Sequence, residues 1–521
     1  MDCLAAIDIG STSTKAFLFD LSGRVVSQAS TPMNVEHTDE ANPSWAFWHP
    51  EKVWESVCAV MRAASCPPAL APPDEATVLG VAVTGLGMDG LPVDSDGEWL
   101  YPFISWHCTR TEPQSRRWSE RIGRKRLFEL SGKQVQPFDT VYRLLWMQEF
   151  RPEILRRADR WLLIEDWVNF KLCGSRATDF SMASTTSLFD QRKRGWSDEL
   201  VEAAGVKVRL LPDVAPSGTR IGTVTPAASR VTALRAGTPV FLGGHDYLCA
   251  ALAAGAFQPG VVLDITGTWE LVVRAVDRPL LSEEAFDAGL TVESHVANGM
   301  YCTTGFAVSA DMTEWYRREF CYEERERAAI AGCTDWQCIM DGPAEAPVGA
   351  DGVFFLPHFS GAGTPVNDSR SLGAFVGLHN GVTKACLARA MFEGLNYQSR
   401  KLIDAVVSSA GGPVPRIVVT GGAARNSFWM QNKADIIGRP IDVSDTEEAT
   451  ALGAAILAGI GAGVYSSESD AYEKTCADVR TVEPDQGAAE QYARYNHIFE
   501  SLYPALRGVN ESIYRNFRLR E

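Results

Sequence analysis

Two segments of the chain each place an aspartate before a short turn of glycine and hydroxyl residues, between two hydrophobic strands. The first spans residues 4–20 and includes Asp8, and the second spans residues 261–273 and includes Asp264. A turn of this composition exposes backbone N–H groups and hydroxyl donors, which suits a phosphate. Two such turns, half a chain apart, predict two related lobes that each hold one end of a polyphosphate, as in an ATP-using enzyme with a cleft. Two ordinary β-hairpins are the alternative interpretation.

The first turn resembles a Walker loop only superficially. Residues 10–15 lack a second glycine before the lysine, and a strand follows them rather than a helix, so we expect a phosphate held in a hairpin turn. Asp8 enters this turn from a buried strand, where a carboxylate can hold Mg²⁺ through water beside ATP phosphates. A turn-capping carboxylate is the alternative. The candidate phosphate-binding residues are Ser11, Thr12, Ser13 and Lys15 in the first turn and Thr266, Gly267 and Thr268 in the second.

Asp246 follows the strand-like run 238–242 and the sequence Gly243-Gly244-His245. Open α/β sheets bind their ligands at the carboxyl ends of strands. A carboxylate there can take the proton from an attacking hydroxyl, and phosphoryl transfer needs little more than such a base, Mg²⁺ and positioning. We therefore expect Asp246 to be the catalytic base and, with Asp8, a metal contact; a helix N-cap is the alternative. His245 alone fits a structural role as well as a functional one.

Two glycine loops add candidate ligand contacts. Residues 85–90 match G-x-G-x-x-G, but a strand and a turn follow where the dinucleotide fingerprint requires a helix, so we reject a Rossmann site. This loop is better suited to presenting Asp89 to a polar ligand. Residues 421–424 (Gly-Gly-Ala-Ala) follow a predicted strand and let a flat adenine approach the backbone, although such connections also serve packing.

The bulk composition sets limits on these interpretations. A chain of 521 residues is too long for one core, so two or three domains are expected. A net charge of -16 argues against a nucleic-acid partner. The longest apolar runs are too short to span a bilayer, and no signal peptide is visible. The 12 cysteines show no metal-binding spacing. We expect a cytoplasmic enzyme with no membrane partner.

The elements that position these residues can be predicted from periodicity and from the placement of proline and glycine. A loop is expected at 66–73, and the lobe boundary is placed near residue 248. We expect helices over 50–64, 139–148, 161–172, 250–256, 309–318, 384–407, 426–437 and 450–460, and strands over 78–84, 238–242 and 416–419.

These pieces, in this order, resemble the FGGY carbohydrate kinases over essentially the whole chain. The likeness rests on both phosphate turns, on the signature from Phe354 to Leu378, on residues 421–431 and 448–455, and on Arg143-Leu144-Leu145-Trp146. The resemblance implies an α/β protein with two actin-like lobes of the ribonuclease H-like, Hsp70/actin ATPase type and an interlobe cleft. It also implies ATP and Mg²⁺ as cofactors, with Gly421, Gly422 and Asn426 at the nucleotide.

The resemblance further implies a small-molecule sugar substrate, with lobes at 1–248 (sugar side) and 249–521 (nucleotide side). Residues 101–111 and 267–270 look like those of fuculose kinases, so a fuculose-like 6-deoxyketohexose or a pentulose is expected. Alternatives are a small polyol such as erythritol or glycerol, of which Phe138 disfavours glycerol, and a non-catalytic or chaperone-like ATPase. A homodimer is a further expectation. The candidate sugar contacts are Met88, Asp89, Trp106, Phe138, Asp246 and Trp269.

Overall fold

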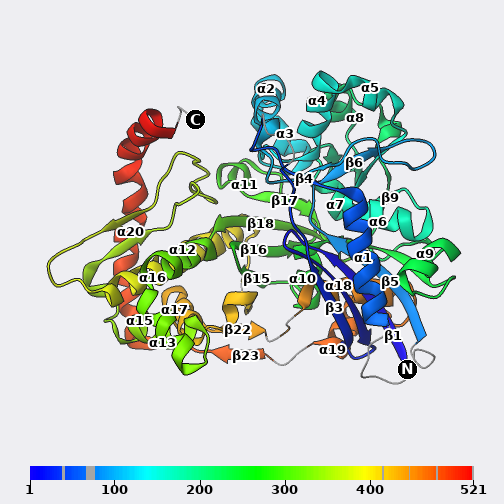
Figure 1. The fold of residues 1–521 in the computed structure, drawn as a ribbon. Helices are drawn as coiled ribbons and strands as arrows, with labels where there is room; N and C mark the ends of the chain where they lie inside the picture. Colours follow the sequence, from blue (N-terminus) through cyan, green and yellow to red (C-terminus); the bar gives the residue numbers. More distant parts are fainter. Residues whose placement is uncertain are drawn as a thin grey trace.

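The computed structural model describes residues 1–37, 42–65, 77–413, 416–444, 446, 448–476 and 479–518. The chain forms two lobes, each built on one large mixed sheet (Figure 1). The predicted loop at 66–73 lies outside the described residues. No helix in the described part is long and apolar enough to cross a membrane.

The sheet of the first lobe begins with an antiparallel meander. Its strands, in spatial order, are β13 (Arg220–Thr223), β14 (Pro239–His245), β5 (Thr77–Gly85), β1 (Asp2–Ile9), β2 (Ser13–Asp20) and β3 (Val25–Pro32). β1, β2 and β3 run antiparallel, whereas β5 and β14 add in parallel on the other side of β1. The carboxyl ends of β1, β5 and β14 therefore meet at one edge, which carries Asp8, the glycine loop and Asp246.

The sheet of the second lobe repeats this plan. Its order is β17 (Thr291–Ser294), β18 (Tyr301–Val308), β16 (Trp269–Val276), β15 (Val261–Thr266), β21 (Arg416–Thr420), β22 (Ile441–Ser444) and β23 (Val479–Val482). β15 and β16 form the second hairpin, β18 continues it, and β21 and β22 run parallel to β15. The prediction of two related lobes is confirmed.

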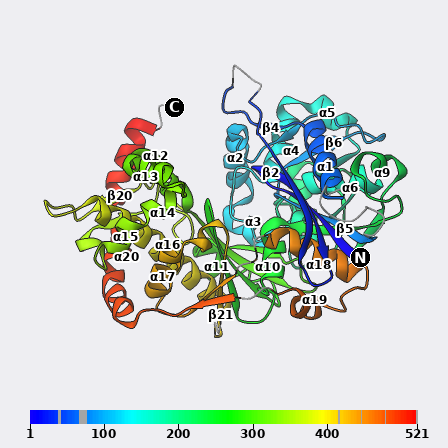
Figure 2. The ribbon, with the colours of Figure 1, turned by 60° about the horizontal axis from the view of Figure 1, so that its bottom comes forward.

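Two small-residue helices lie between the sheets. α10 (Asp246–Ala253) follows β14, and α18 (Ala449–Gly461) packs on α10 and on β1, β5 and β14 of the first lobe. In Figures 1 and 2, α18, in orange, lies beside the blue strands although it comes late in the chain. Gly453 permits this contact, because an added Cβ would lie 1.9 Å from the carbonyl oxygen of Cys249.

Each of the remaining helices belongs to one of the two lobes. The first lobe has α1 (Pro50–Ser65), α2 (Glu112–Ile122), α3 (Arg124–Ser131), α4 (Thr140–Phe150), α5 (Pro152–Arg157), α6 (Ile164–Cys173), α7 (Phe180–Ser184), α8 (Asp198–Ala204) and α9 (Pro226–Thr232). The second has α11 (Glu283–Asp287), α12 (Ala310–Phe320), α13 (Tyr322–Ala331), α14 (Asp335–Ile339), α15 (Asp341–Glu345), α16 (Lys384–Ala410), α17 (Ser427–Ile437), α19 (Glu468–Thr475) and α20 (Gln486–Ile513).

Short strand pairs connect these layers. They are β4 (Phe47–Trp48) with β7 (Phe103–Ile104), β6 (Gly90–Val93) with β8 (Arg160–Leu163), β9 (Ala177–Asp179) with β12 (Asp213–Ala215), β10 (Phe189–Asp190) with β11 (Gly195–Trp196), and β19 (Phe354–Leu356) with β20 (Ala374–Val376). β6 directly after the glycine loop confirms that a strand, not a helix, follows it.

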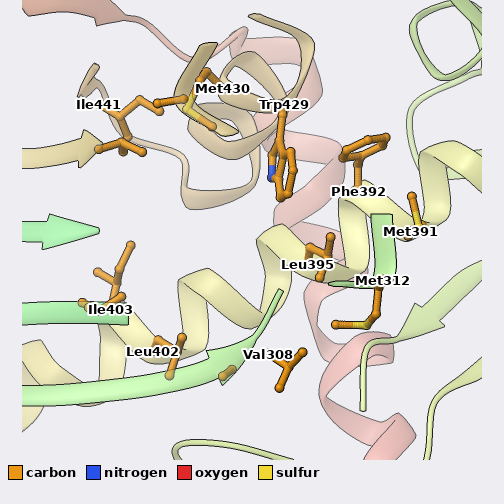
Figure 3. Close-up of a cluster of buried hydrophobic side chains, with 14 of the residues drawn as sticks. Val308, Met312, Met391, Phe392, Leu395, Leu402, Ile403, Trp429, Met430 and Ile441 are labelled. Carbon is orange, nitrogen blue, oxygen red and sulfur yellow. The ribbon is translucent and has the colours of Figure 1, made fainter. Parts of the chain in front are cut away.

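The core of the second lobe lies where α16 and α17 pack on the sheet. Figure 3 shows Trp429 and Met430 of α17 and Phe392 and Leu395 of α16 among the side chains of this cluster. The rings of Phe392 and Trp429 meet edge to face, with centroids 5.1 Å apart. This packing fixes α17, whose first turn reaches the predicted nucleotide side.

The starts of two predicted helices differ from the structure by three residues or more. Residues 160–163 form β8 and the helix begins only at Ile164, so the predicted helix over 161–172 is wrong in its first turn. The cause is tertiary, because β8 pairs with β6 far back in the chain. The helix predicted over 250–256 begins at Asp246 and ends at Ala253.

Candidate active site between the two lobes

The first predicted turn lies beside a cavity between the lobes. In the hairpin of β1 and β2, Asp8 pairs with Lys15. Both residues line a cavity of about 350 Å³. The second lobe contributes most of the other walls, which include Gly421, Gly422, Arg425, Ser444, Thr446 and Glu448. The structure thus brings Asp8 and Lys15 together with the predicted adenosine turn.

The tip of this hairpin holds the other candidate phosphate contacts. Thr12 is exposed, and Ser11 and Ser13 are half-buried. The N–H of Gly10 donates to the carbonyl of Ser13 (3.0 Å), which closes the turn. These residues do not line the cavity, so their phosphate contacts stay predictions.

Asp8 and Asp246 are close enough for their charges to interact. Loss of hydration and the negative charge of Asp246 raise the pKa of Asp8 to about 7, against the opposing effect of Lys15. In the described residues, no group of three or more His, Cys, Asp or Glu side chains is arranged to hold a metal ion. A pair of carboxylates nevertheless fits Mg²⁺, because this ion takes one or two carboxylates and completes its octahedron with water and phosphate oxygens.

One of the two threonine hydroxyls in the second turn is buried inside the protein. Thr266 is fully buried, and its Oγ1 accepts a hydrogen bond from Lys433 Nζ (2.8 Å). This side chain therefore anchors the turn from beneath, and a phosphate contact of Thr266 stays a prediction. Gly267 and Thr268 line a second cavity and remain predicted phosphate contacts. The carbonyl of Thr268 accepts the N–H of Ser309 (2.9 Å), which ties the turn to the start of α12.

Lys433 on α17 is a member of this site that sequence reasoning missed. Besides Thr266, its buried ammonium donates to Asp264 (2.6 Å) and to Glu270 (2.5 Å). The ammonium thereby uses three donors to join the end of β15 to the start of β16. A lysine within a regular helix carries no sequence signal of such a role.

The second cavity, of about 1010 Å³, adjoins the first at Gly422, which lines both. A Cβ added at Gly422 would meet no atom within 4 Å, so a ligand can approach the backbone there. Gly421 has a packing role, because its φ is +105° and an added Cβ would lie 2.5 Å from the Thr266 carbonyl oxygen. Asn426 also lines this cavity, and its Oδ1 accepts the N–H of Trp429 (3.0 Å), capping α17.

Several lining residues of this larger cavity were not predicted. They come from α12, from α14 and from the residue after α14. Among them, an indole suits an adenine ring, and two carboxylates suit ribose hydroxyls. They are Asp311, Glu314, Trp336, Gln337 and Met340. Because the two cavities share Gly422, a nucleotide can place its base in the larger one and its phosphates in the smaller one.

Asp89 is engaged inside the protein. It is 0% exposed; its Oδ1 accepts Arg143 Nη2 (2.7 Å), and its Oδ2 accepts Trp48 Nε1 (2.7 Å) and the Trp106 N–H (3.1 Å). Burial raises its pKa to about 6, against the opposing effect of Arg143. The carbonyl of the half-buried Met88 accepts Arg143 Nη1 (2.5 Å). Asp89 therefore organises the wall beside the predicted sugar side, and direct contact with a sugar stays a prediction.

The aromatic candidates divide between the lobes. Trp106 stacks on His107 with centroids 3.9 Å apart, and Phe138 meets it edge-on at 6.4 Å. Trp269 belongs to the second lobe, where it is 39% exposed and packs against Phe306. The structure thus brings Trp106 and Phe138 together, and their ring faces can pack on the apolar face of a sugar.

Asp246 is the first residue of α10, and the N-cap position belongs to His245. The N-cap interpretation of Asp246 is therefore wrong. The Asp246 side chain is 35% exposed, and loss of hydration raises its pKa. Gly243 allows β14 to pack closely on the neighbouring strand β5 at this edge, because an added Cβ would lie 1.9 Å from the carbonyl oxygen of Val83 in β5. A partly exposed carboxylate of raised pKa beside Asp8 has the placement and basicity that a general base needs.

The duplicated sheets and the residues that meet between them define a two-lobed, actin-like phosphotransferase. The model of the FGGY family of carbohydrate kinases, N-terminal domain, matches residues 3–253, and that of the C-terminal domain matches residues 263–462. The chain therefore belongs to the FGGY family of carbohydrate kinases, ATP-dependent enzymes that phosphorylate sugar hydroxyls.

Individual relatives agree with this assignment. The chain is 33% identical over 511 residues to an L-fuculokinase of Salmonella typhi, covering 97% of this chain and 98% of that protein. It is 29% identical over 519 residues to an Autoinducer-2 kinase of Klebsiella pneumoniae subsp. pneumoniae, covering 98% and 96%. The xylulose kinase structure from Rhodospirillum rubrum matches with a TM-score of 0.87 at 27% identity, covering 98% of this chain and 100% of that one. The resemblance stated from the sequence is confirmed.

Proposed function

We propose that this kinase transfers the γ-phosphoryl group of ATP to a hydroxyl of a small ketose, a fuculose-like 6-deoxyketohexose or a pentulose. The observation that carries the proposal is the shared cavity that Asp8 and Lys15 of the first lobe line with Gly421 and Gly422 of the second. The electrostatic coupling of Asp8 with Asp246 supports a base close to that cavity.

In this mechanism Asp246 accepts the proton of the attacking hydroxyl, while Lys15 and the N–H groups of both turns bind phosphate oxygens. Asp8 and Asp246 would hold Mg²⁺, which neutralises phosphate charge when bound. The adenosine lies in the larger cavity beside Asn426 and Trp336. Closure of the lobes excludes water and so limits unproductive ATP hydrolysis.

The substrate class rests on the relatives and on the wall of the first lobe. Similarity to an L-fuculokinase over nearly the full length of both chains supports a 6-deoxyketohexose. The xylulose kinase fold match supports a pentulose as the second choice. Trp106 and Phe138 supply ring faces that suit the apolar edge of either sugar. The homodimer and the cytoplasmic location stay predictions.

The test is Mg-ATP-dependent ADP release against a panel of acceptors. The panel comprises L-fuculose, L-rhamnulose, D-ribulose, L- and D-xylulose, D-tagatose, erythrulose, autoinducer-2, glycerol and erythritol. We expect one ketose to give a kcat/KM of about 10⁴ M⁻¹s⁻¹ or more, the low end for enzymes on their own substrates. A response only to polyols would replace the ketose, and ADP release independent of every acceptor would indicate an ATPase instead.

A further inference from the structure

Glu293 contacts both residues that flank the proposed base. It lies on β17 of the second lobe and is 1% exposed. The hydroxyl of Tyr247 donates a hydrogen bond to Glu293 Oε2, and Nδ1 of His245 lies 3.9 Å from the same oxygen. Asp246 stands between these two residues in the sequence, so one carboxylate from the opposite lobe binds the residue after it and faces the residue before it.

Glu293 is kept ionised by its surroundings. Lys133 Nζ lies 3.0 Å from Glu293 Oε1 and 3.8 Å from Oδ1 of Asp139, and all three side chains are buried. Burial opposes ionisation, but Lys133 and His245 lower the pKa of Glu293 well below its ordinary value. An ionised carboxylate only accepts hydrogen bonds. Any polar group that faces Glu293 closely must therefore present a proton to it.

The ring of His245 is confined between two carboxylates. Its Nε2 lies 3.7 Å from Asp246 Oδ1, and a Cβ added at Gly87 would lie 2.9 Å from that nitrogen. Its Nδ1 is buried and has no hydrogen-bond partner, with Glu293 the acceptor it faces. The groups that face this ring are thus Asp246, Glu293 and Tyr247, with Lys133 behind Glu293.

We propose that Glu293 is a positioning residue for Asp246, which holds Tyr247 by its hydroxyl and keeps a proton on Nδ1 of His245, so that the start of α10 is fixed against the second lobe. This inference rests on the proposed function, in which Asp246 is the base. It also explains why a buried charge pair joins the lobes at this point, because Lys133 belongs to the first lobe and Glu293 to the second. The placement of the base then depends on how the lobes meet.

The kinetic test compares Glu293→Gln with a matched control. Glu393→Gln removes another buried carboxylate, which accepts Tyr492 Oη (2.6 Å) and Arg389 Nε (2.8 Å) in the second lobe. We expect Glu293→Gln to lower kcat roughly 10- to 100-fold, the effect of misplacing a reacting group, with an unchanged KM for ATP. Tyr247→Phe should lower kcat less, because the contact with His245 remains. Glu393→Gln should lose thermal stability without this selective loss of kcat.

A second measurement does not depend on activity. Two-bond ¹H–¹⁵N spectra of the full chain with ¹⁵N-labelled histidine show which ring nitrogen carries the proton, and His245→Gln assigns the His245 signal. We expect a proton on Nδ1 of His245 in the wild type and its loss in Glu293→Gln, with no change in Glu393→Gln.

The outcomes separate the two proposals. If the wild type phosphorylates no acceptor, the proposed function fails, and the tautomer alone then decides the role of Glu293. If the wild type is active, a wild-type kcat in Glu293→Gln overturns the inference. Equal kcat losses in Glu293→Gln and Glu393→Gln also overturn it, as does an Nε2–H tautomer that the substitution leaves unchanged.

Discussion

Lys15 Nζ lies 2.9 Å and 3.2 Å from the two carboxylate oxygens of Glu448. Lys15 belongs to β2 of the first lobe, and Glu448 directly precedes α18, so the pair crosses the cavity that both residues line. The ammonium that we expect to bind an ATP phosphate is therefore already occupied by a carboxylate. Nucleotide binding must exchange one anionic partner of Lys15 for another.

Replacing Glu448 by glutamine should therefore strengthen ATP binding. The two side chains are 30% and 24% exposed. A pair of this kind contributes up to about 1 kcal/mol, so the Kd for ATP should fall by up to about fivefold. Calorimetric titration of the variant with ATP measures this change. Asp442→Asn, which breaks a similarly exposed pair with Arg416 outside the cavity, is the control. Weaker ATP binding in Glu448→Gln alone would show that Glu448 assists the nucleotide.

The role of Asp246 as general base predicts a selective loss of rate. Asp246→Asn keeps the shape of the side chain but removes its basicity, so we expect kcat to fall about 10²- to 10⁴-fold. ATP binding should persist, because the larger cavity is unchanged. Steady-state kinetics and ATP titration of the same preparation check both parts. Near-normal turnover in this variant would remove the assigned role.

The raised pKa of Asp8 predicts a pH effect on magnesium dependence. Its pKa is about 7, so below neutral pH a proton competes with Mg²⁺ for this carboxylate. We expect the apparent KM for Mg²⁺ to rise as pH falls below about 7, approaching tenfold per pH unit. Asp8→Asn should bind Mg²⁺ weakly at every pH. A flat Mg²⁺ requirement in the wild type from acidic to neutral pH would contradict the assignment.

The raised pKa of Asp8 also makes the free energy of unfolding depend on pH. The folded-state pKa of Asp8 lies above the ordinary aspartate value of 3.8, so the native state binds this proton more tightly than the unfolded state. The stability that Asp8 contributes to the folded state is fully present below its pKa in the unfolded chain. It is lost as pH rises through the folded-state pKa of about 7. Without Mg²⁺ and ATP, thermal melting should therefore show a wild-type advantage over Asp8→Asn that shrinks between mildly acidic and neutral pH.

Much of the fold could be predicted because its elements are locally encoded. The hydrophobic strands around Asp8 and Asp264, and the long apolar period of α16, form the predicted structures. β8 was missed because its assignment depends on pairing with β6, which no local periodicity shows. Asp246 was foreseen as lying at a strand end, but not as the first residue of its helix.

The site was predictable only where a motif carries the chemistry. Asp8, Lys15 and Gly422 belong to turns with a distinctive composition, and they line the same cavity. Lys433 was not predicted because its partner Asp264 lies 169 residues away in the sequence. Such buried charges are recognised only after folding, when desolvation forces each one to have a partner.

The larger cavity predicts a selective defect in nucleotide binding. Trp336 lines this cavity, and stacking of an aromatic ring on a base is worth roughly 1–3 kcal/mol, so Trp336→Ala should raise the KM for ATP about 5- to 160-fold. The KM for the sugar should not change, because Trp106 and Phe138 lie in the other lobe. Trp315→Ala is the matched control, since Trp315 packs on the same core as Trp336 but contacts Phe320 and Phe359 instead. Equal effects of both substitutions on ATP would mean that loss of packing, not loss of stacking, causes the defect.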